Sequence, residues 1–200
     1  MQPKTNRQQQ AINTRNRIYE SALALFADGD YEKVTISDIC KKAGVSAGHF
    51  YNYFDSKETI LMAEYPAFDE FVKNEFANKV HNTNIEAILE LIGYQTKGAE
   101  QLGSGIFSQV LRIQLKTKGK FVVEKDRYFH YYLEQLVKQA IDAKELSPTY
   151  TAREITQMIL LHTRGILFDW SMRREFYSPY ETAIHNVKML LRLFQLPISQ

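Results

Sequence analysis

Apolar residues recur along most of the chain at intervals of three and four, the spacing of an α-helix with one buried face. In the first such segment Ile18, Ala22, Leu25 and Phe26 fall on one side of a helix. The alternation of apolar and polar residues that marks a half-buried strand is hard to find, and proline and glycine are scarce. The pattern therefore predicts an all-α fold.

Side-chain caps and glycines divide the N-terminal part into short helices. Residues 1 to about 12 are polar and Gln-rich, which is typical of a loose arm, and Asp28-Gly29-Asp30 should end the first helix. Thr35-Ile36-Ser37-Asp38 has the spacing of a capping box and starts a second helix. Ser46 can cap a third helix, and Ser56, or Asp55 beside it, a fourth.

Longer helices follow Pro66, which should end or kink the fourth helix. They are predicted over residues 67–80, 84–101, 104–116, 121–145, 151–175 and 179–195. The chain is thus predicted to hold about nine or ten helices in two domains. These are an N-terminal three-helix domain with its following helix, residues 12–65, and a helical bundle, residues 66–200.

The last two helices carry more apolar residues than one bundle contact needs, as in ITQMILLHTRGILFDW and AIHNVKMLLRLF. One interpretation is a central core helix. The other is a two-helix face that meets a second copy of the chain to form a four-helix interface.

Composition narrows the functional classes. The net charge of +2 gives no global argument for nucleic acid, so any such argument must be local. A single cysteine excludes an internal disulfide and fits a reducing compartment. Neither a membrane-length apolar run nor a secretory signal is present, and we expect a cytoplasmic protein.

The densest aromatic stretch of the chain is AGHFYNYF, residues 47–54. On a helical wheel Phe50 and Phe54 share one face, and we expect them to be core residues. The remaining side chains are small or polar, with two tyrosines at the flanks, which is the layout of a recognition helix in a helix-turn-helix. Small residues let a helix approach base edges, and His49 or Asn52 can hydrogen-bond there.

The candidate DNA contacts fall into two groups. Base edges are assigned to Ala47, Gly48, His49 and Asn52, and phosphates to Thr35, Ser37, Tyr51, Tyr53 and Lys57. Taken singly, each of these side chains is more typical of an ordinary surface or packing residue, and their joint placement after a capped helix and a glycine turn favours the DNA interpretation. Up to Lys57 the chain has eight basic and six acidic residues, so one module should bind DNA weakly and two linked copies better.

Residues 14–63 resemble the N-terminal domain of the TetR family of bacterial transcriptional regulators, in TRNRI, LFADGDYEKVTI, DICKKAGVS and FYNYFDSKE in this order. The resemblance implies an all-α homodimer that binds a pseudo-palindromic double-stranded DNA operator, most often as a repressor. It also implies a C-terminal domain whose small-molecule effector releases the DNA. The nine candidate contacts above match DNA-contacting positions of the family, although His49, Phe50 and Asn52 depart from its common residues.

Polar residues inside the apolar helices of the second domain are candidates for an effector site, together with aromatic residues nearby. The candidates are Tyr94, Phe107, Gln109, Tyr128, His162 and Arg164. Arg164 could equally pair with Asp169 across a dimer of the last two helices. The histidines are too dispersed for a metal site, and we expect no metal and no cofactor.

Two other functional classes compete with a regulator. An enzyme is disfavoured because phosphate loops, a nucleophile elbow and HExxH are absent from the sequence. A helical adaptor that binds only protein would explain the last helices but not the layout of residues 35–57. An activator of the same fold is the remaining alternative to a repressor.

Overall fold

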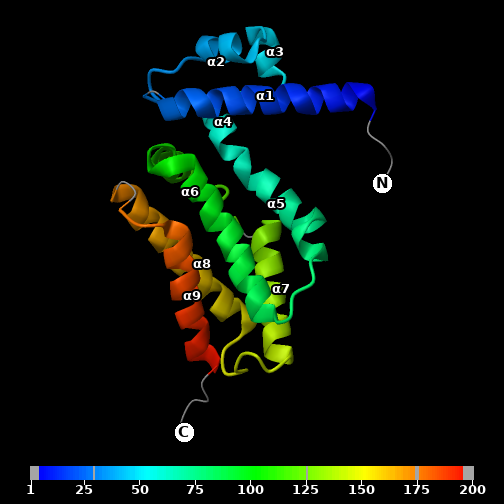
Figure 1. Cartoon of the computed structure of the whole chain (residues 1–200), viewed down its shortest axis with the longest axis vertical. Coiled ribbons are helices and arrows are strands. Elements are labelled where there is room, and N and C mark those ends of the chain that lie inside the picture. The colour runs from blue at the N-terminus through cyan, green and yellow to red at the C-terminus, as the bar shows by residue number, and fades with distance from the viewer. Residues whose placement is uncertain (1–4, 29, 125, 174–175, 196–200) are drawn as a thin grey trace. The chain divides into compact units, whose positions relative to one another are not determined.

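A computed structural model describes residues 5–28, 30–124, 126–173 and 176–195. Within these residues the protein is all-α, with nine α-helices, one short 3₁₀ helix and no strand, so the predicted fold class is confirmed (Figure 1). The chain divides into two compact units, Met1–Glu64 and Tyr65–Gln200. Each unit is described separately below.

Unit 1 contains four helices: α1 Asn6–Asp28, α2 Ile36–Ala43, α3 Ala47–Tyr51 and α4 Lys57–Met62. Figure 1 shows α2 and α3 along one side of the long helix α1. Their inward faces form a small core, whose buried members include Ile18, Ala22, Phe26, Ile39, Cys40, Phe50, Phe54 and Ile60. This core holds the short helices in place, because a five-residue helix such as α3 has no stability of its own.

The start of α1 corrects one prediction. The helix begins at Asn6, so the described part of the predicted loose arm is helical from there on. Thr5 and Gln8 cap each other: the backbone N–H of Gln8 donates to Thr5 Oγ1 (3.3 Å), and that of Thr5 donates to Gln8 Oε1 (2.9 Å). Gln, Ala and Arg also have high helix propensity, so a segment rich in them can be helical although it is polar. Residues 1–4 of that arm, and Gly29 in the predicted helix end, lie outside the described residues.

The predicted caps of the next three helices are confirmed. Thr35 and Asp38 form the capping box of α2, Ser46 accepts a hydrogen bond from the backbone N–H of His49, and Ser56 caps α4. Gly44 ends α2 in the left-handed region, at φ 63°, where a side chain would be strained. α3 is shorter than the predicted helix, which ran to about residue 54.

The break after α4 comes before Pro66 and not at it. α4 ends at Met62, and α5 (Glu64–Asn74) carries Pro66 in its first turn. Proline has no N–H to donate to the carbonyl four residues earlier, and its ring crowds that carbonyl, here the one of Met62. One proline therefore ends one helix and is tolerated at the start of the next.

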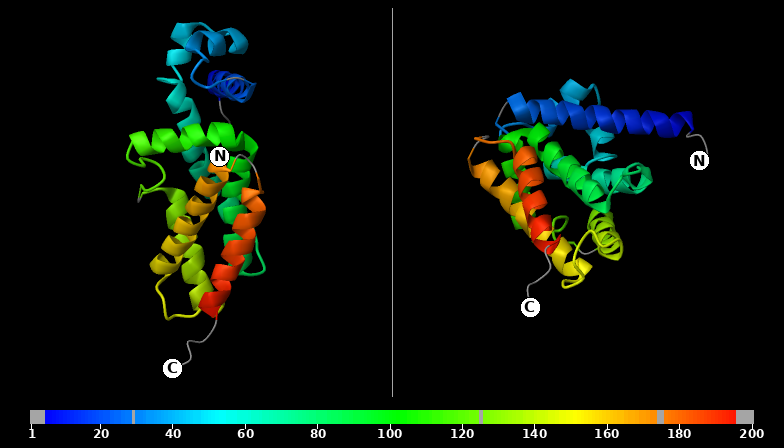
Figure 2. Two further views of the ribbon diagram at one scale, coloured as in Figure 1. Left: turned by 90° about the vertical axis from the view of Figure 1, so that its left-hand side faces the viewer. Right: turned by 60° about the horizontal axis from the view of Figure 1, so that its bottom comes forward.

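Unit 2 is a helical bundle that contains nearly all of α5 and the 3₁₀ helix Phe76–Asn78. Its long helices are α6 (Asn84–Lys116), α7 (Tyr128–Asp142), α8 (Ala152–Met172) and α9 (Pro179–Gln195). α6 packs against α7, α8 and α9, and Figure 2 shows these helices from two further sides. The buried side chains between them include Ile88, Leu91, Ile92, Phe129, Leu133, Ile159 and Val187.

Two predicted helices of unit 2 are one kinked helix. The predicted break between residues 101 and 104 is a kink within α6, at Gly103, whose φ of 77° and ψ of 153° are open to glycine and not to an L side chain. α7 begins at Tyr128, seven residues after its predicted start. The segment before it turns instead, with Lys118 and Gly119 both at positive φ.

Candidate functional site

The candidate recognition helix α3 separates anchoring side chains from exposed ones. Phe50 is fully buried and Phe54 is 4% exposed, and the guanidinium of Arg15 lies 5.1 Å from the centre of the Phe54 ring. The small and polar residues predicted to approach bases are all exposed, namely Ala47, Gly48, His49 and Asn52. The helix is therefore fixed from one side, while the other side is free to meet a partner.

The two tyrosines of α3 and its following turn differ in their surroundings. Tyr51 is 54% exposed and its ring contacts Phe50 edge-on, 5.4 Å between centres. Tyr53 is half-buried and stacks on the ring of His49 at 5.7 Å. The stack restricts His49 at the exposed surface, and both phenol groups stay close to the exposed face of α3.

Thr35 and Ser37, the predicted phosphate contacts of α2, are both exposed. The Thr35 hydroxyl donates to Asp38 Oδ2 (2.6 Å) and accepts from the Asp38 backbone N–H (3.1 Å). The backbone N–H of Thr35 also donates to Asp38 Oδ2 (2.9 Å), and the two donations from Thr35 to this carboxylate hold the pKa of Asp38 below its usual value. Thr35 is thus engaged in its cap, and Ser37 lies exposed in the first turn of α2.

Lys57 makes contacts that sequence reasoning missed. Its ammonium donates to the backbone carbonyls of Tyr31 (2.8 Å) and Val34 (2.7 Å) and lies 4.6 Å from the centre of the Tyr31 ring. A phosphate contact would have to compete with these carbonyls. The phosphate role of Lys57 stays a prediction, and the structure adds a second role, the support of the loop between α1 and α2.

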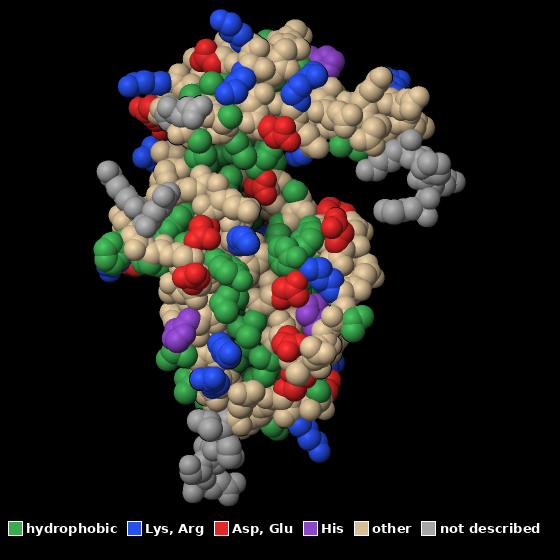
Figure 3. Space-filling view, in the orientation of Figure 1, with side chains coloured by type: hydrophobic (Ala, Val, Ile, Leu, Met, Phe, Trp, Pro, Cys, Tyr) green, Lys and Arg blue, Asp and Glu red, His purple; other side chains and the backbone are tan. Residues whose placement is uncertain are grey.

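The surface charge over this region is mixed. Figure 3 shows acidic and basic side chains interspersed over α1 to α3 on the face that it presents. This agrees with the balance of +2 counted up to Lys57. Phosphate attraction from one copy of unit 1 is therefore modest.

The six candidate effector residues do not come together in one place. Tyr94 accepts a hydrogen bond from Lys79 (2.8 Å) and is 40% exposed, whereas Phe107 is buried against Trp170. Tyr128 stacks with Tyr132 at 6.1 Å. His162 is exposed on α8, Gln109 is half-buried on α6, and Arg164 faces the segment between α6 and α7.

Asp169 does not pair with Arg164 within the chain. Its carboxylate accepts instead from Arg173 Nε (2.8 Å) and from the Tyr177 hydroxyl (3.0 Å). Burial and the bond to this carboxylate raise the pKa of Tyr177 to about 12. Both contacts are to Oδ2 of Asp169, and the pairing of Arg164 with Asp169 across a dimer stays a prediction.

A polar cluster in unit 2 contains Arg164 together with residues that sequence reasoning did not single out. The Arg127 side chain, 5% exposed, donates to both carboxylate oxygens of Asp69, at 3.0 and 2.9 Å. The Arg164 guanidinium donates to the carbonyl of Val122 and lies 3.4 Å from Nε2 of His130. Sequence spacing gives no hint of Arg127 and Asp69, because they are 58 residues apart.

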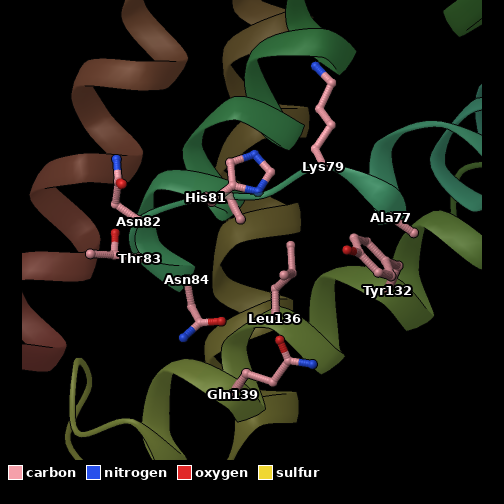
Figure 4. Close-up of a pocket in the computed structure, with 10 residues that line it drawn as sticks. Ala77, Lys79, His81, Asn82, Thr83, Asn84, Tyr132, Leu136 and Gln139 are labelled. Carbon is pink, nitrogen blue, oxygen red and sulfur yellow. The ribbon is translucent and has the colours of Figure 1, made fainter.

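A separate cavity of about 370 Å³ lies in unit 2 where the chain enters α6. Figure 4 shows His81 and Leu136 between Asn84 and Tyr132 in that view. Glu90 pairs with both basic groups of the lining, Lys79 at 2.8 Å and His81 at 2.7 Å. The lining comprises Ala77, Lys79, His81, Asn82, Thr83, Asn84, Ala87, Tyr132, Leu136 and Gln139. It includes none of the six candidate effector residues.

α8 and α9 each have a buried and an exposed apolar side. Ile159 and Ile166 of α8, with Val187 of α9, belong to the core of unit 2. On the outer sides several large apolar residues are at least half exposed: Met158, Leu161, Phe168, Met172, Met189 and Leu193. None of the described helices is long and apolar enough to span a membrane.

Residues 18–63 match the model of a family described as bacterial regulatory proteins, tetR family. This segment contains the second half of α1 and all of α2, α3 and α4, and it includes every candidate DNA contact. The match places this N-terminal segment of the chain in the tetR family.

Two curated relatives illustrate the range of the likeness. The HTH-type transcriptional regulator YuxN of Bacillus subtilis is 44% identical over 46 residues, which are 23% of this chain and 16% of YuxN. The probable acrEF/envCD operon repressor of Escherichia coli is 22% identical over 197 residues, 92% of this chain and 88% of that protein. The chain thus spans only about a sixth of the length of YuxN.

Among solved structures, the fatty acid degradation regulator FadR from Bacillus halodurans superposes with a TM-score of 0.68. The superposition covers 95% of this chain and 97% of that one at 20% identity. At this identity the likeness concerns the fold, and it extends over both units.

Proposed function

We propose that the protein is a transcriptional repressor that binds a pseudo-palindromic operator as a homodimer and is released by a small-molecule effector. The observation that carries the proposal is the division of α3 into a buried phenylalanine anchor and an exposed side of small and polar residues. A helix of this shape fits the major groove, which is about 12 Å wide. The protein would act in the cytoplasm, where its operator lies.

In this proposal base reading falls to α3 and the turn after it. Gly48 carries no side chain and has open space around it, so the helix can approach base edges closely. His49 and Asn52 offer hydrogen bonds to them, and each good pairing discriminates between bases by about 1–3 kcal/mol. Tyr51, which is 54% exposed, is the strongest phosphate candidate of this helix. Tyr53, Thr35, Ser37 and Lys57 complete the proposed phosphate set.

The proposed dimer forms through the exposed apolar sides of α8 and α9. The cost of leaving Leu161 and Leu193 in water, at 63% and 66% exposure, would be relieved by a second copy on the same faces. A dimer would also compensate for the weak DNA binding expected of a single unit 1. Once one copy is bound, the second copy meets the DNA at a high effective concentration.

The choice of a repressor with an effector draws support from the relatives. The E. coli protein that matches nearly the whole chain is a probable operon repressor, and the B. halodurans protein of the same fold regulates fatty acid degradation. We infer a small amphipathic effector that binds in unit 2. Enzymatic activity is not part of the proposal.

Selection of bound duplexes from a random DNA pool tests the DNA part directly. A two-fold-symmetric motif with half-sites about 34–36 Å apart is the expected result. His49→Ala should change which bases are enriched, whereas Gln157→Ala, an exposed change on α8, should not. If folded protein at low salt enriches no sequence, the proposed function is wrong and a protein-binding adaptor becomes the better hypothesis.

A further inference from the structure

Among the residues that the structure describes, Arg164 is a half-buried cation without an acidic partner. Within the residues that the structure describes, no carboxylate forms an ion pair with it, and its contacts are the carbonyl of Val122 and Nε2 of His130. Burial, and next the charge of Arg127, hold the pKa of Arg164 below its usual value. Both causes mean that the charged guanidinium is less well stabilised here than in water.

The neighbouring arginine shows what a complete pairing looks like in the same region. Arg127 binds both oxygens of Asp69, and one of these oxygens also accepts the backbone N–H of Phe129 at 3.0 Å. Asp69 is therefore committed to Arg127 and to the start of α7. It leaves the charge of Arg164 unbalanced.

His130 does not change this balance near neutral pH. Its Nδ1 lies 3.0 Å from the carbonyl of Glu124, an arrangement in which Nδ1 carries the proton and Nε2 turns its lone pair toward Arg164. Burial, and the charges of the two arginines, lower the pKa of His130 to about 4. The cluster of Arg127, Arg164, Asp69 and His130 therefore carries a net charge of +1.

The surroundings of the cluster are aromatic. The ring of Tyr65 stacks on Phe121 at 5.6 Å and 11°, and the Arg127 guanidinium lies 5.0 Å from the centre of the Tyr65 ring. Burial raises the pKa of Tyr65 to about 12, so its hydroxyl stays neutral. A ligand group at this place would meet one uncompensated cation, neutral polar groups and ring faces.

We propose that Arg164 binds the carboxylate of an amphipathic effector, and this inference rests on the effector-controlled function proposed above. A planar guanidinium matches the two oxygens of a carboxylate. A single negative charge brings the cluster to zero, whereas a doubly charged phosphate would leave an excess. The carboxylate would replace the carbonyl of Val122 and so release the segment between α6 and α7 from α8.

The test uses the single tryptophan of the chain as a reporter of binding without DNA. Trp170 is 1% exposed, lies on the same helix as Arg164 and packs against Phe107 at 5.9 Å. Its fluorescence is followed while dodecanoate, dodecanol or dodecyl phosphate is added to the whole chain. Dodecanoate is expected to bind at least about tenfold more tightly than dodecanol, from a charge-assisted contact.

Arg164→Gln should remove this preference for the carboxylate and leave dodecanol binding unchanged, and Arg164→Lys should restore part of it. Arg153→Gln, an exposed change on the same helix, is the matched control and should keep the preference. Circular dichroism confirms that each variant is folded. Equal binding of dodecanoate by the wild type and Arg164→Gln, no binding of dodecanoate at all, or a preference for dodecyl phosphate would each overturn the inference.

The readout also separates this inference from the proposed function. Dodecanoate binding that depends on Arg164 in a protein that enriches no DNA would uphold the site and refute the regulator. Operator binding by a protein whose affinity for dodecanoate does not depend on Arg164 would uphold the regulator and refute the site.

Discussion

Replacement of Lys57 by methionine separates two roles of one side chain. The ammonium donates to the carbonyls of Tyr31 and Val34, which belong to the loop between α1 and α2. Methionine keeps most of the length of the side chain but makes neither hydrogen bond. A hydrogen bond to a charged group contributes about 1.5–3 kcal/mol when buried, and the half-exposed position of Lys57 reduces this. We expect the free energy of unfolding of unit 1 to fall by about 2 kcal/mol.

The effect on DNA binding depends on what the ammonium does in the complex. If it stays on the two carbonyls, Lys57→Met weakens binding through the stability of unit 1 and leaves the salt dependence unchanged. If it reaches a phosphate, the slope of log affinity against log salt falls by about 1. The contacts favour the first outcome, because the donors of the ammonium already face carbonyl oxygens.

Urea unfolding and operator binding at several salt concentrations measure both quantities. Lys33→Met is the matched control, since this lysine lies in the same loop with an 84% exposed side chain and should change stability by less than about 0.5 kcal/mol. A shallower salt slope with unchanged stability would refute the structural role assigned to Lys57.

Three further changes test other features. The pKa of His130 is lowered from 6.5 to about 4, so the unfolded chain takes up a proton at a higher pH than the folded chain does. The free energy of unfolding should therefore fall by up to about 3 kcal/mol as the pH drops from about 6.5 to about 4. His130→Gln should flatten this part of the profile of stability against pH, and parallel profiles for the two proteins would contradict the lowered pKa. Gly103→Ala should cost about 1–3 kcal/mol in urea unfolding, since its φ of 77° excludes a side chain, while Gly98→Ala on the open side of the same helix should be neutral or stabilising; equal effects would remove the role of the kink. Leu161→Glu should give a folded monomer in light scattering, and a persistent dimer would show that this face is not the interface.

Much of unit 1 could be predicted because its signals are local. A cap is written within four residues, as in Thr35 to Asp38, and the burial of Phe50 and Phe54 follows from their spacing on one helix. The spacing of Thr5 and Gln8 could have predicted the start of α1 in the same way, but the polar composition of the segment favoured the interpretation as a loose arm.

Contacts between distant residues could not be predicted in this way. The choice of polar residues inside apolar helices identified Arg164, but also His162, which is exposed on the other side of that helix. Nothing in the spacing connects Arg164 with Val122, 42 residues earlier, or Lys57 with Tyr31. Such pairs depend on how whole helices pack against one another, and the spacing of residues in a single sequence does not predict that packing.

The division of α3 into two sides has a consequence for how the protein can change over generations. Phe50 and Phe54 provide the anchorage, whereas the exposed residues His49 and Asn52 contribute little to the core. Substitutions at exposed positions usually alter stability by less than about 0.5 kcal/mol. New binding preferences can therefore be sampled at almost constant stability, so a duplicated copy of this chain could acquire a different target by a few exposed substitutions while its scaffold stays the same.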